Sequence, residues 1–96
     1  MNQIYKKKHF IIFRVKDGFI VHNTKKPFYR GHTHISNLNT AKYIINLSIN
    51  KNMPHHLSKY LIVSLIRLAT DQRYIHRLNG LLEQKRKPKK NCENRR

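Results

Sequence analysis

The sequence predicts an α+β domain, with an N-terminal β-hairpin (and room for a third short strand) packed on three α-helices and followed by a disordered basic tail. Three observations support this prediction. Residues 9–24 are rich in Phe, Ile and Val around a turn signal, residues 36–84 repeat apolar side chains at helical spacing, and residues 85–96 carry almost none. With 96 residues in all, we expect a basic arm at 1–8, one domain at 9–84 and the tail at 85–96.

The predicted hairpin spans His9–Thr24, with Lys16-Asp17-Gly18 at its turn. A two-residue Asp-Gly turn would pair Lys16 with Phe19, whereas a three-residue loop with a left-handed Gly18 pairs Val15 with Phe19. We expect the second register. It turns one set of side chains toward the helices, namely Ile11, Phe13, Val15, Phe19 and Val21. The outer face then carries Phe10, Ile12, Arg14, Ile20, His22 and Thr24, and is apolar enough to be partly covered or used for binding.

The segments on either side of the hairpin are basic. Met1–Lys8 has no hydrophobic period and three consecutive lysines, so a loose arm is predicted. Lys25–Gly31 is predicted to be a loop, because Pro27 and Gly31 punctuate it, and it mixes three cations with two aromatic rings. His32–Ile35 follows as the candidate third strand.

Two helices are predicted after this strand. The first is capped by Ser36 or Asn37 and runs to about Asn52, with an inner stripe of Leu38, Ala41, Ile45 and Ile49. The second lies within Pro54–Ala69. Its apolar residues cover most of its circumference, with Leu57, Leu61, Leu65 and Leu68 in one stripe and Arg67 as the only charge after Tyr60. Such a helix is expected to be buried at the centre of the protein.

A third helix is predicted after Thr70-Asp71, which supplies its cap and an acidic first turn. Its buried side is expected to consist of Ile75, Leu78, Leu81 and Leu82, with Arg73, Arg77 and Lys85 outside. Gly80 weakens the helix and is a position where it can bend. From Lys85 onward seven positive charges stand against one negative charge, a composition that cannot form a core.

The formal net charge of +17, from 21 Lys and Arg against four Asp and Glu, indicates a polyanionic partner. Nucleic acid, either RNA or DNA, is the first candidate and a ribonucleoprotein complex the second. An anionic membrane comes third, because no basic amphipathic helix with an exposed Trp or Phe face is visible.

Aromatic residues next to cations define the candidate binding residues, because stacked bases and a bound backbone require flat rings among positive charges. The opposing interpretation places these rings in the core. The last two predicted helices also suggest a helix-turn-helix, although the second presents few polar side chains for base edges. The candidate nucleic-acid-binding residues are Lys6, Lys7, Lys8, Arg14, Lys25, Lys26, Phe28, Tyr29, Arg30, Arg73, Arg77, Lys85, Arg86 and Lys87.

The composition argues against an enzyme. Asp17 is needed by a turn and Asp71 by a helix cap, and Glu93 lies in the tail, which leaves only Glu83 for acid–base or metal chemistry. Two histidine pairs, His32 with His34 and His55 with His56, suggest a metal site if they meet, but they lack the paired spacing of a zinc motif. We therefore predict no catalytic residues, no cofactor, no metal and no small-molecule substrate.

The single cysteine, Cys92, lies in the tail and fits a reducing compartment. The apolar stretch Phe10–Phe13 is too short for a signal-peptide core, and no span reaches the length of a membrane helix. A cytoplasmic location is expected.

Three stretches of the chain read His-Phe-Ile-Ile-Phe-Arg-Val-Lys-Asp-Gly-Phe-Ile-Val-His-Asn-Thr, Gly-His-Thr-His-Ile and Met-Pro-His-His-Leu-Ser-Lys-Tyr-Leu-Ile-Val-Ser-Leu-Ile-Arg-Leu. They resemble small basic proteins carried on phages, plasmids and conjugative elements of low-G+C Gram-positive bacteria, over about residues 9–80. The resemblance implies a setting rather than an activity. The expected function is a non-catalytic nucleic-acid-binding accessory or regulatory protein, and the alternative is an inhibitor of the anti-CRISPR type that docks on a CRISPR effector nuclease and its guide RNA or DNA channel.

Overall fold

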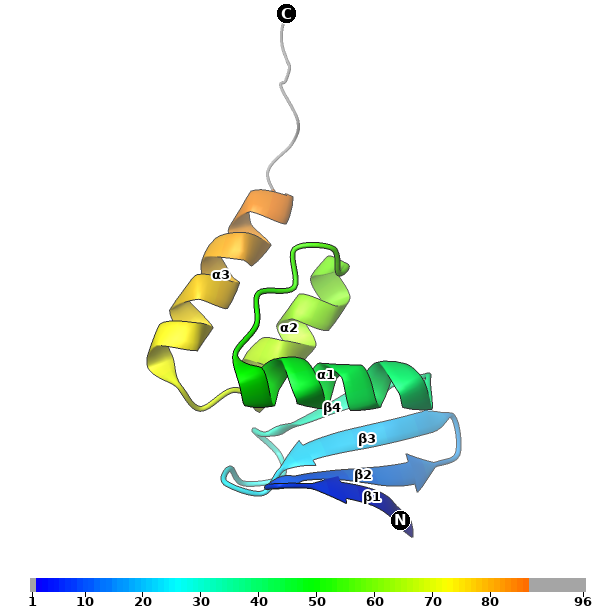
Figure 1. Cartoon of the computed structure of the whole chain (residues 1–96). Helices are drawn as coiled ribbons and strands as arrows, with labels where there is room; N and C mark the ends of the chain where they lie inside the picture. The colour runs from blue at the N-terminus through cyan, green and yellow to red at the C-terminus, as the bar shows by residue number, and fades with distance from the viewer. Residues whose placement is uncertain (1, 87–96) are drawn as a thin grey trace, which may run out of the picture.

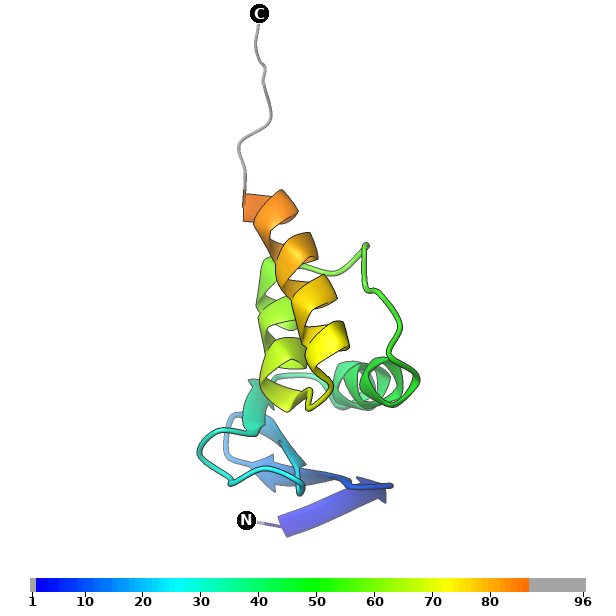
Figure 2. The same ribbon diagram turned by 90° about the vertical axis from the view of Figure 1, so that its left-hand side faces the viewer.

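A computed structural model describes residues 2–86 and confirms the α+β class. Four antiparallel strands form one sheet in the order β1-β2-β3-β4. In Figures 1 and 2 all three helices lie on the same side of this sheet. The elements are β1 (Asn2–Lys7), β2 (Phe10–Val15), β3 (Gly18–Asn23), β4 (His32–Ile35), α1 (Leu38–Asn50), α2 (Lys59–Leu68) and α3 (Gln72–Arg86).

The prediction of a loose basic arm is wrong for Asn2–Lys7, which forms the edge strand β1. This strand pairs with β2 from Asn2↔Arg14 to Lys7↔Phe10, with a bulge between Gln3 and Tyr5. Tyr5 packs against the core, and this contact holds a strand that is otherwise exposed. Lysines at an edge also oppose pairing with another chain. The sheet therefore has four strands instead of a hairpin with one addition, although β4 matches the predicted third strand.

The hairpin register also differs from both predicted alternatives. Val15 pairs with Gly18, so Lys16 and Asp17 are the two turn residues and Gly18 begins β3. Gly18 has φ +146°, and a Cβ built there would lie 3.0 Å from the carbonyl oxygen of Ile35. A glycine is therefore required by the close approach of β4, which is a tertiary constraint that the turn sequence does not reveal.

This register reverses the predicted faces of β2. Phe10 and Ile12 point toward the helices and are buried, whereas Ile11 and Phe13 point away. The faces of β3 are as predicted, with Val21 on the helix side and His22 on the outer side.

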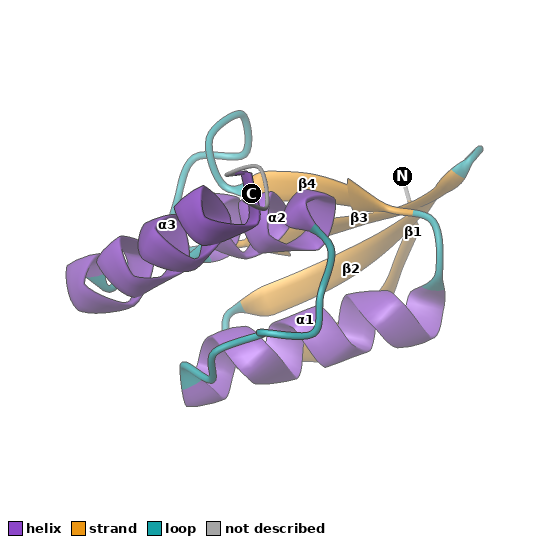
Figure 3. Ribbon diagram, turned by 90° about the horizontal axis from the view of Figure 1, so that it is seen from above, coloured by secondary structure: helices purple, strands orange, loops and turns teal. Residues whose placement is uncertain are grey.

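The core lies between the sheet and the helices, and Figure 3 shows α1 and α2 over the strands. Helix α2 contributes Ile62, Leu65 and Leu68, all fully buried, as expected of the central helix. It begins at Lys59 with Ser58 as N-cap, so Pro54–Leu57 precede the helix rather than form its first turn. Partly buried side chains complete its predicted apolar surface, namely Leu57, Leu61, Val63 and Ile66.

The outer helices follow the predicted bounds closely. Helix α1 has Asn37 as its N-cap, whose side chain accepts a hydrogen bond from the backbone N–H of Thr40. Helix α3 packs on α2 and continues through Gly80 to Arg86. Tyr74 joins Leu78, Leu81 and Leu82 in its buried stripe and replaces the predicted Ile75, which is only partly buried.

Across residues 2–86, no helix has the length and apolar character needed to cross a bilayer.

Candidate nucleic-acid interface

The face of the sheet that no helix of residues 2–86 covers is the strongest candidate for a binding surface. Side chains from all four strands meet there in two rows across the sheet, as the strand register requires. We call this surface the open face. Its first row is Lys6, Ile11, His22 and His32, and its second row is Gln3, Phe13, Ile20 and His34.

Four rings form a continuous cluster at the β3–β4 side of the open face. The ring of Phe28 stacks on His32 with centroids 4.4 Å apart and planes 3° from parallel. His22 meets the edge of Phe28 at 5.2 Å, and His34 meets His32 at 5.4 Å. We call these four side chains the ring cluster. His34 and Phe28 are exposed, so the cluster presents ring surface to solvent.

Local hydrogen bonds hold the ring cluster in place. The imidazole Nδ1 of His32 lies 2.6 Å from the carbonyl oxygen of Phe28, and Nε2 of His22 lies 3.0 Å from that of Lys26. These contacts tie the loop between β3 and β4 back onto the strands. A surface that is organised before a ligand arrives loses less entropy on binding.

The same loop is anchored to the C-terminus of α2. The ammonium group of Lys26 donates to the carbonyl oxygens of Arg67 and Ala69, at 2.8 and 3.1 Å. Burial, together with Arg30 and Arg67, lowers the pKa of Lys26. Arg67 in turn donates from Nε to the carbonyl oxygen of His32 at 2.8 Å. The structure thus gives Lys26, a predicted phosphate contact, a role in capping a helix end.

Several predicted binding residues lie on the open face or in the loop next to the ring cluster. Lys6 projects from the edge strand β1 on the open face, and the loop between β3 and β4 carries Tyr29 and Arg30, both exposed. Lys25, in the same loop, is also exposed and borders a hollow on the helical side. Tyr29 is 72% exposed, so its ring is not part of the core. Phe28, at 38%, belongs to the ring cluster.

The structure does not bring the other predicted residues to this face. Lys7 donates to Asn46 on α1 at 2.6 Å, and the guanidinium of Arg14 lies 5.4 Å from the ring centroid of Phe19 on the helix side. Lys8 occupies the turn between β1 and β2. Helix α3, which lies on the helical side in Figure 1, carries Arg73, Arg77, Lys85 and Arg86. The basic tail was predicted to begin at Lys85, but Lys85 and Arg86 form the end of α3. Lys87 and the rest of the predicted tail lie outside the described residues.

His32, His34 and Phe13 were not among the predicted nucleic-acid-binding residues; His32 and His34 were considered only for a metal site, and His22 only as part of an outer face open to a binding use. A usable signal was present, because the two histidines of β4 alternate with Thr33 and Ile35, which are buried on the other face. The predicted register, which was wrong, placed Phe13 among the buried residues, so the side chains of this face were not recognised as one surface.

The second histidine pair lies elsewhere. His55 and His56 precede α2, where Nε2 of His56 lies 2.9 Å from the hydroxyl of Tyr43. The four histidines therefore do not converge, and no group of three or more potential metal ligands occurs among residues 2–86.

The positive charge of the chain is largely unneutralised from within. Among the described residues one ion pair forms, between Lys51 Nζ and Asp71 Oδ2 at 3.0 Å. The cations around the open face therefore remain available to an external anion.

Comparison of the chain with protein-family models, with curated proteins and with solved structures finds no match.

Proposed function

We propose that this protein binds single-stranded nucleic acid on the open face of its sheet. The observation that carries the proposal is the ring cluster of His22, Phe28, His32 and His34, which lies on a sheet face that none of the described helices covers, in a chain of net charge +17. Exposed rings on a sheet stack with unpaired bases, and neighbouring cations bind the phosphates that connect them.

The residues divide this task by their chemistry. Phe28 and His34 present exposed ring surface for stacking, and Phe13 adds a third ring in the middle of the sheet. Lys6 on β1 and Arg30, exposed in the loop between β3 and β4, supply phosphate contacts. A duplex hides the flat faces of its bases, so a single strand is the better ligand for stacking.

The proposed role is non-catalytic. The carboxylates within residues 2–86 belong to separate parts of the fold: Asp17 lies in the β2–β3 turn, Asp71 precedes α3, and Glu83 is on α3. Asp71 is also engaged by Lys51. A binding protein that serves as an accessory or regulator on a mobile genetic element accounts for the basic surface without requiring acid–base chemistry.

The proposal is tested by binding of fluorescent oligodeoxythymidylate and oligouridylate, each compared with a duplex of equal length. Phe28→Ala and His34→Ala should each weaken binding by about 1–3 kcal/mol with the salt dependence unchanged, because stacking is lost and no cation is removed. His55→Ala, an exposed histidine away from the open face, is the matched control and should bind like the parent.

The double variant Lys6→Ala with Arg30→Ala separates charge from stacking, and it leaves Lys25 unchanged. It should weaken binding to every sequence, and it should reduce the slope of log affinity against log salt by the amount that corresponds to about two phosphate contacts. Equal binding by the ring variants and the parent, measured per folded molecule, would contradict the proposal.

Ile11 and Phe13 support a second candidate function, because both are partly exposed and add apolar surface to the middle of the open face, where their neighbour Ile20 is buried. Such a patch also suits a protein partner, in keeping with an inhibitor that docks on a ribonucleoprotein nuclease. This alternative predicts weak binding to bare oligonucleotides and a tight complex with one machine that survives nuclease treatment.

A further inference from the structure

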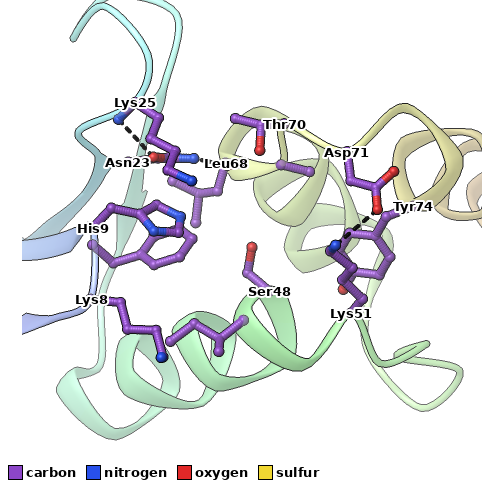
Figure 4. Close-up of a pocket in the computed structure, with 13 residues that line it drawn as sticks. Lys8, His9, Asn23, Lys25, Ser48, Lys51, Leu68, Thr70, Asp71 and Tyr74 are labelled. Carbon is purple, nitrogen blue, oxygen red and sulfur yellow. Dashed lines mark hydrogen bonds and ion pairs between the residues drawn. The ribbon is translucent and has the colours of Figure 1, made fainter.

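A hollow of about 270 Å³ lies on the helical side of the sheet, at the end opposite the β2–β3 turn. It is bordered by the β1–β2 turn, the end of β3, the C-terminus of α1 and the connection from α2 to α3. Figure 4 shows Lys8, His9 and Lys25 on one wall and Lys51, Asp71 and Tyr74 on the other, with Ser48 between them. Its lysines are Lys8, Lys25 and Lys51, and none of them is in the two rows of the open face.

Two of these lysines occupy an unusual backbone conformation. Lys8 and Lys51 both have φ +55°, and they are the only non-glycine residues with positive φ among the described residues. Lys8 lies in a tight turn and Lys51 caps the C-terminus of α1, two places where glycine or asparagine is ordinarily favoured. Both lysines thus adopt a left-handed backbone conformation that lysine disfavours, and both line the same hollow.

The charges around the hollow are mostly positive. Lys8, Lys25 and Lys51 line it together with one carboxylate, Asp71, which accepts from Lys51 at 3.0 Å. Burial, together with the ammonium groups of Lys25 and Lys8, lowers the pKa of His9, which shows that both cations act on the same point. Their repulsion would be relieved by an anion in the hollow.

We propose that this hollow is a phosphate-binding site, which, if the proposed function holds, receives a phosphate of the strand bound on the open face. Ammonium groups from Lys8 and Lys25, the imidazole of His9 and the hydroxyl of Ser48 are the donors that such a group accepts from.

The register places the hollow close to the open face. Phe10 and Asn23 form the last pair of β2 and β3, and both line the hollow. The next pair along the strands is Ile11 with His22, which belongs to the first row of the open face. A nucleic-acid strand that lies on this row is therefore one residue pair away from the end of the sheet, and it reaches the hollow by passing around that end at the β1–β2 turn.

The site is tested by NMR of the His9 ring in the full-length chain during titration with inorganic phosphate, with chloride as the control for ionic strength. We expect a saturable change in the His9 signals and a rise in the pKa of His9, because a bound anion favours the imidazolium.

The variant pair is Lys8→Asn with Lys25→Gln, since asparagine tolerates positive φ and the turn is therefore kept. Affinity for phosphate should fall at least about tenfold. The control Lys16→Asn removes a cation from the β2–β3 turn, at the other end of the sheet, and should leave phosphate binding unchanged. A response of His9 that does not saturate, or one that is equal in the double variant, would overturn the site.

Oligonucleotides identify the source of the phosphate. An oligonucleotide with hydroxyl groups at both ends tests for a backbone phosphodiester, and the same oligonucleotide with a 5′-phosphate tests for a terminal group. A His9 response to either supports a strand phosphate in the hollow. A response to inorganic phosphate with no binding of any oligonucleotide would keep the site and refute the proposed function. Oligonucleotide binding that depends on Phe28 and leaves the His9 signals unchanged would support the proposed function and refute the hollow as a site for a strand phosphate.

Discussion

The two faces of the sheet are built from the same strands and differ in almost every property. On β2 and β3 the covered face carries Phe10, Ile12 and Val21, all buried, whereas the open face carries Phe13 and His22, both partly exposed. Because side chains alternate along a strand, one segment of sequence supplies both surfaces. Along β2, fold stability and binding are therefore assigned to alternate residues, so neighbouring positions should respond very differently to substitution. On β3 the division is less strict, because Ile20 is buried although it lies on the open face.

Polar groups obey the same division. On the covered side, the hydroxyls of Thr33 and Ser64 lie 2.7 Å apart, and the amide of Asn23 donates to the carbonyl oxygen of Leu68 at 2.6 Å. These groups are fully buried and bonded within the fold. On the open side, His34 keeps its ring exposed to solvent, where it is accessible to a ligand.

The largest expected effect compares Ile12 with its neighbour Ile11. Ile12 is fully buried against the helices, so Ile12→Ala should lower the free energy of unfolding by about 2–5 kcal/mol. Ile11 is only partly buried on the open face, so Ile11→Ala should cost less than half as much. Urea denaturation of both variants measures the difference. Equal losses would mean that the open face is covered in solution, by a second copy of the chain or by another partner.

Much of this architecture could be predicted from the sequence. The three helices were predicted because apolar residues recur at helical spacing, and Asn37 and Asp71 lie at helix starts as expected. The predicted buried stripe of α3 did not include Tyr74, which is buried in the structure. Its hydroxyl lies 2.8 Å from the carbonyl oxygen of Asn52, to which it donates, and 3.3 Å from that of Leu47, and these partners are distant in sequence.

The parts that the sequence did not predict depend on tertiary contacts. Strand β1 has almost no hydrophobic pattern, and its order comes from pairing with β2 and from the packing of Tyr5. The hairpin register depends on how closely Gly18 approaches the carbonyl oxygen of Ile35. A shift of one residue exchanges the two faces of β2, so this error also concealed part of the candidate site.

A smaller effect on stability depends on pH. It concerns Tyr74, whose hydroxyl is buried on the helical side, in contrast to the exposed rings of the open face. Burial raises the pKa of Tyr74 to about 12, from 10.0. The folded state therefore holds its proton more tightly than the unfolded state. The resulting stability is fully present below pH 10 and is lost as pH rises from 10 to about 12.

The decisive measurement is the difference between the parent and Tyr74→Phe, because all other ionisable groups are the same in both proteins. The parent should lose its advantage over the variant between pH 10 and 12 when unfolding is followed by circular dichroism. A difference in stability that stays constant over this range would mean that the hydroxyl is solvated in the folded protein.

The smallest expected effect lies on α3, which packs mainly on α2 and stands apart from both faces of the sheet. A Cβ built on Gly80 meets no atom within 4 Å, so an alanine there has free space. Gly80→Ala should raise the free energy of unfolding by up to about 1 kcal/mol, because alanine restricts the unfolded chain and favours the helix. In a domain of this size that corresponds to a rise in melting temperature of about 4–8 °C.

Gly31→Ala is the matched control: its Cβ would lie 2.6 Å from the Cβ of Lys26, so it should destabilise the protein. Oligonucleotide binding by Gly80→Ala should equal that of the parent, which makes it a stable background for comparing variants of the two faces. A lower melting temperature for Gly80→Ala would show that the helix does not run straight through this position in solution.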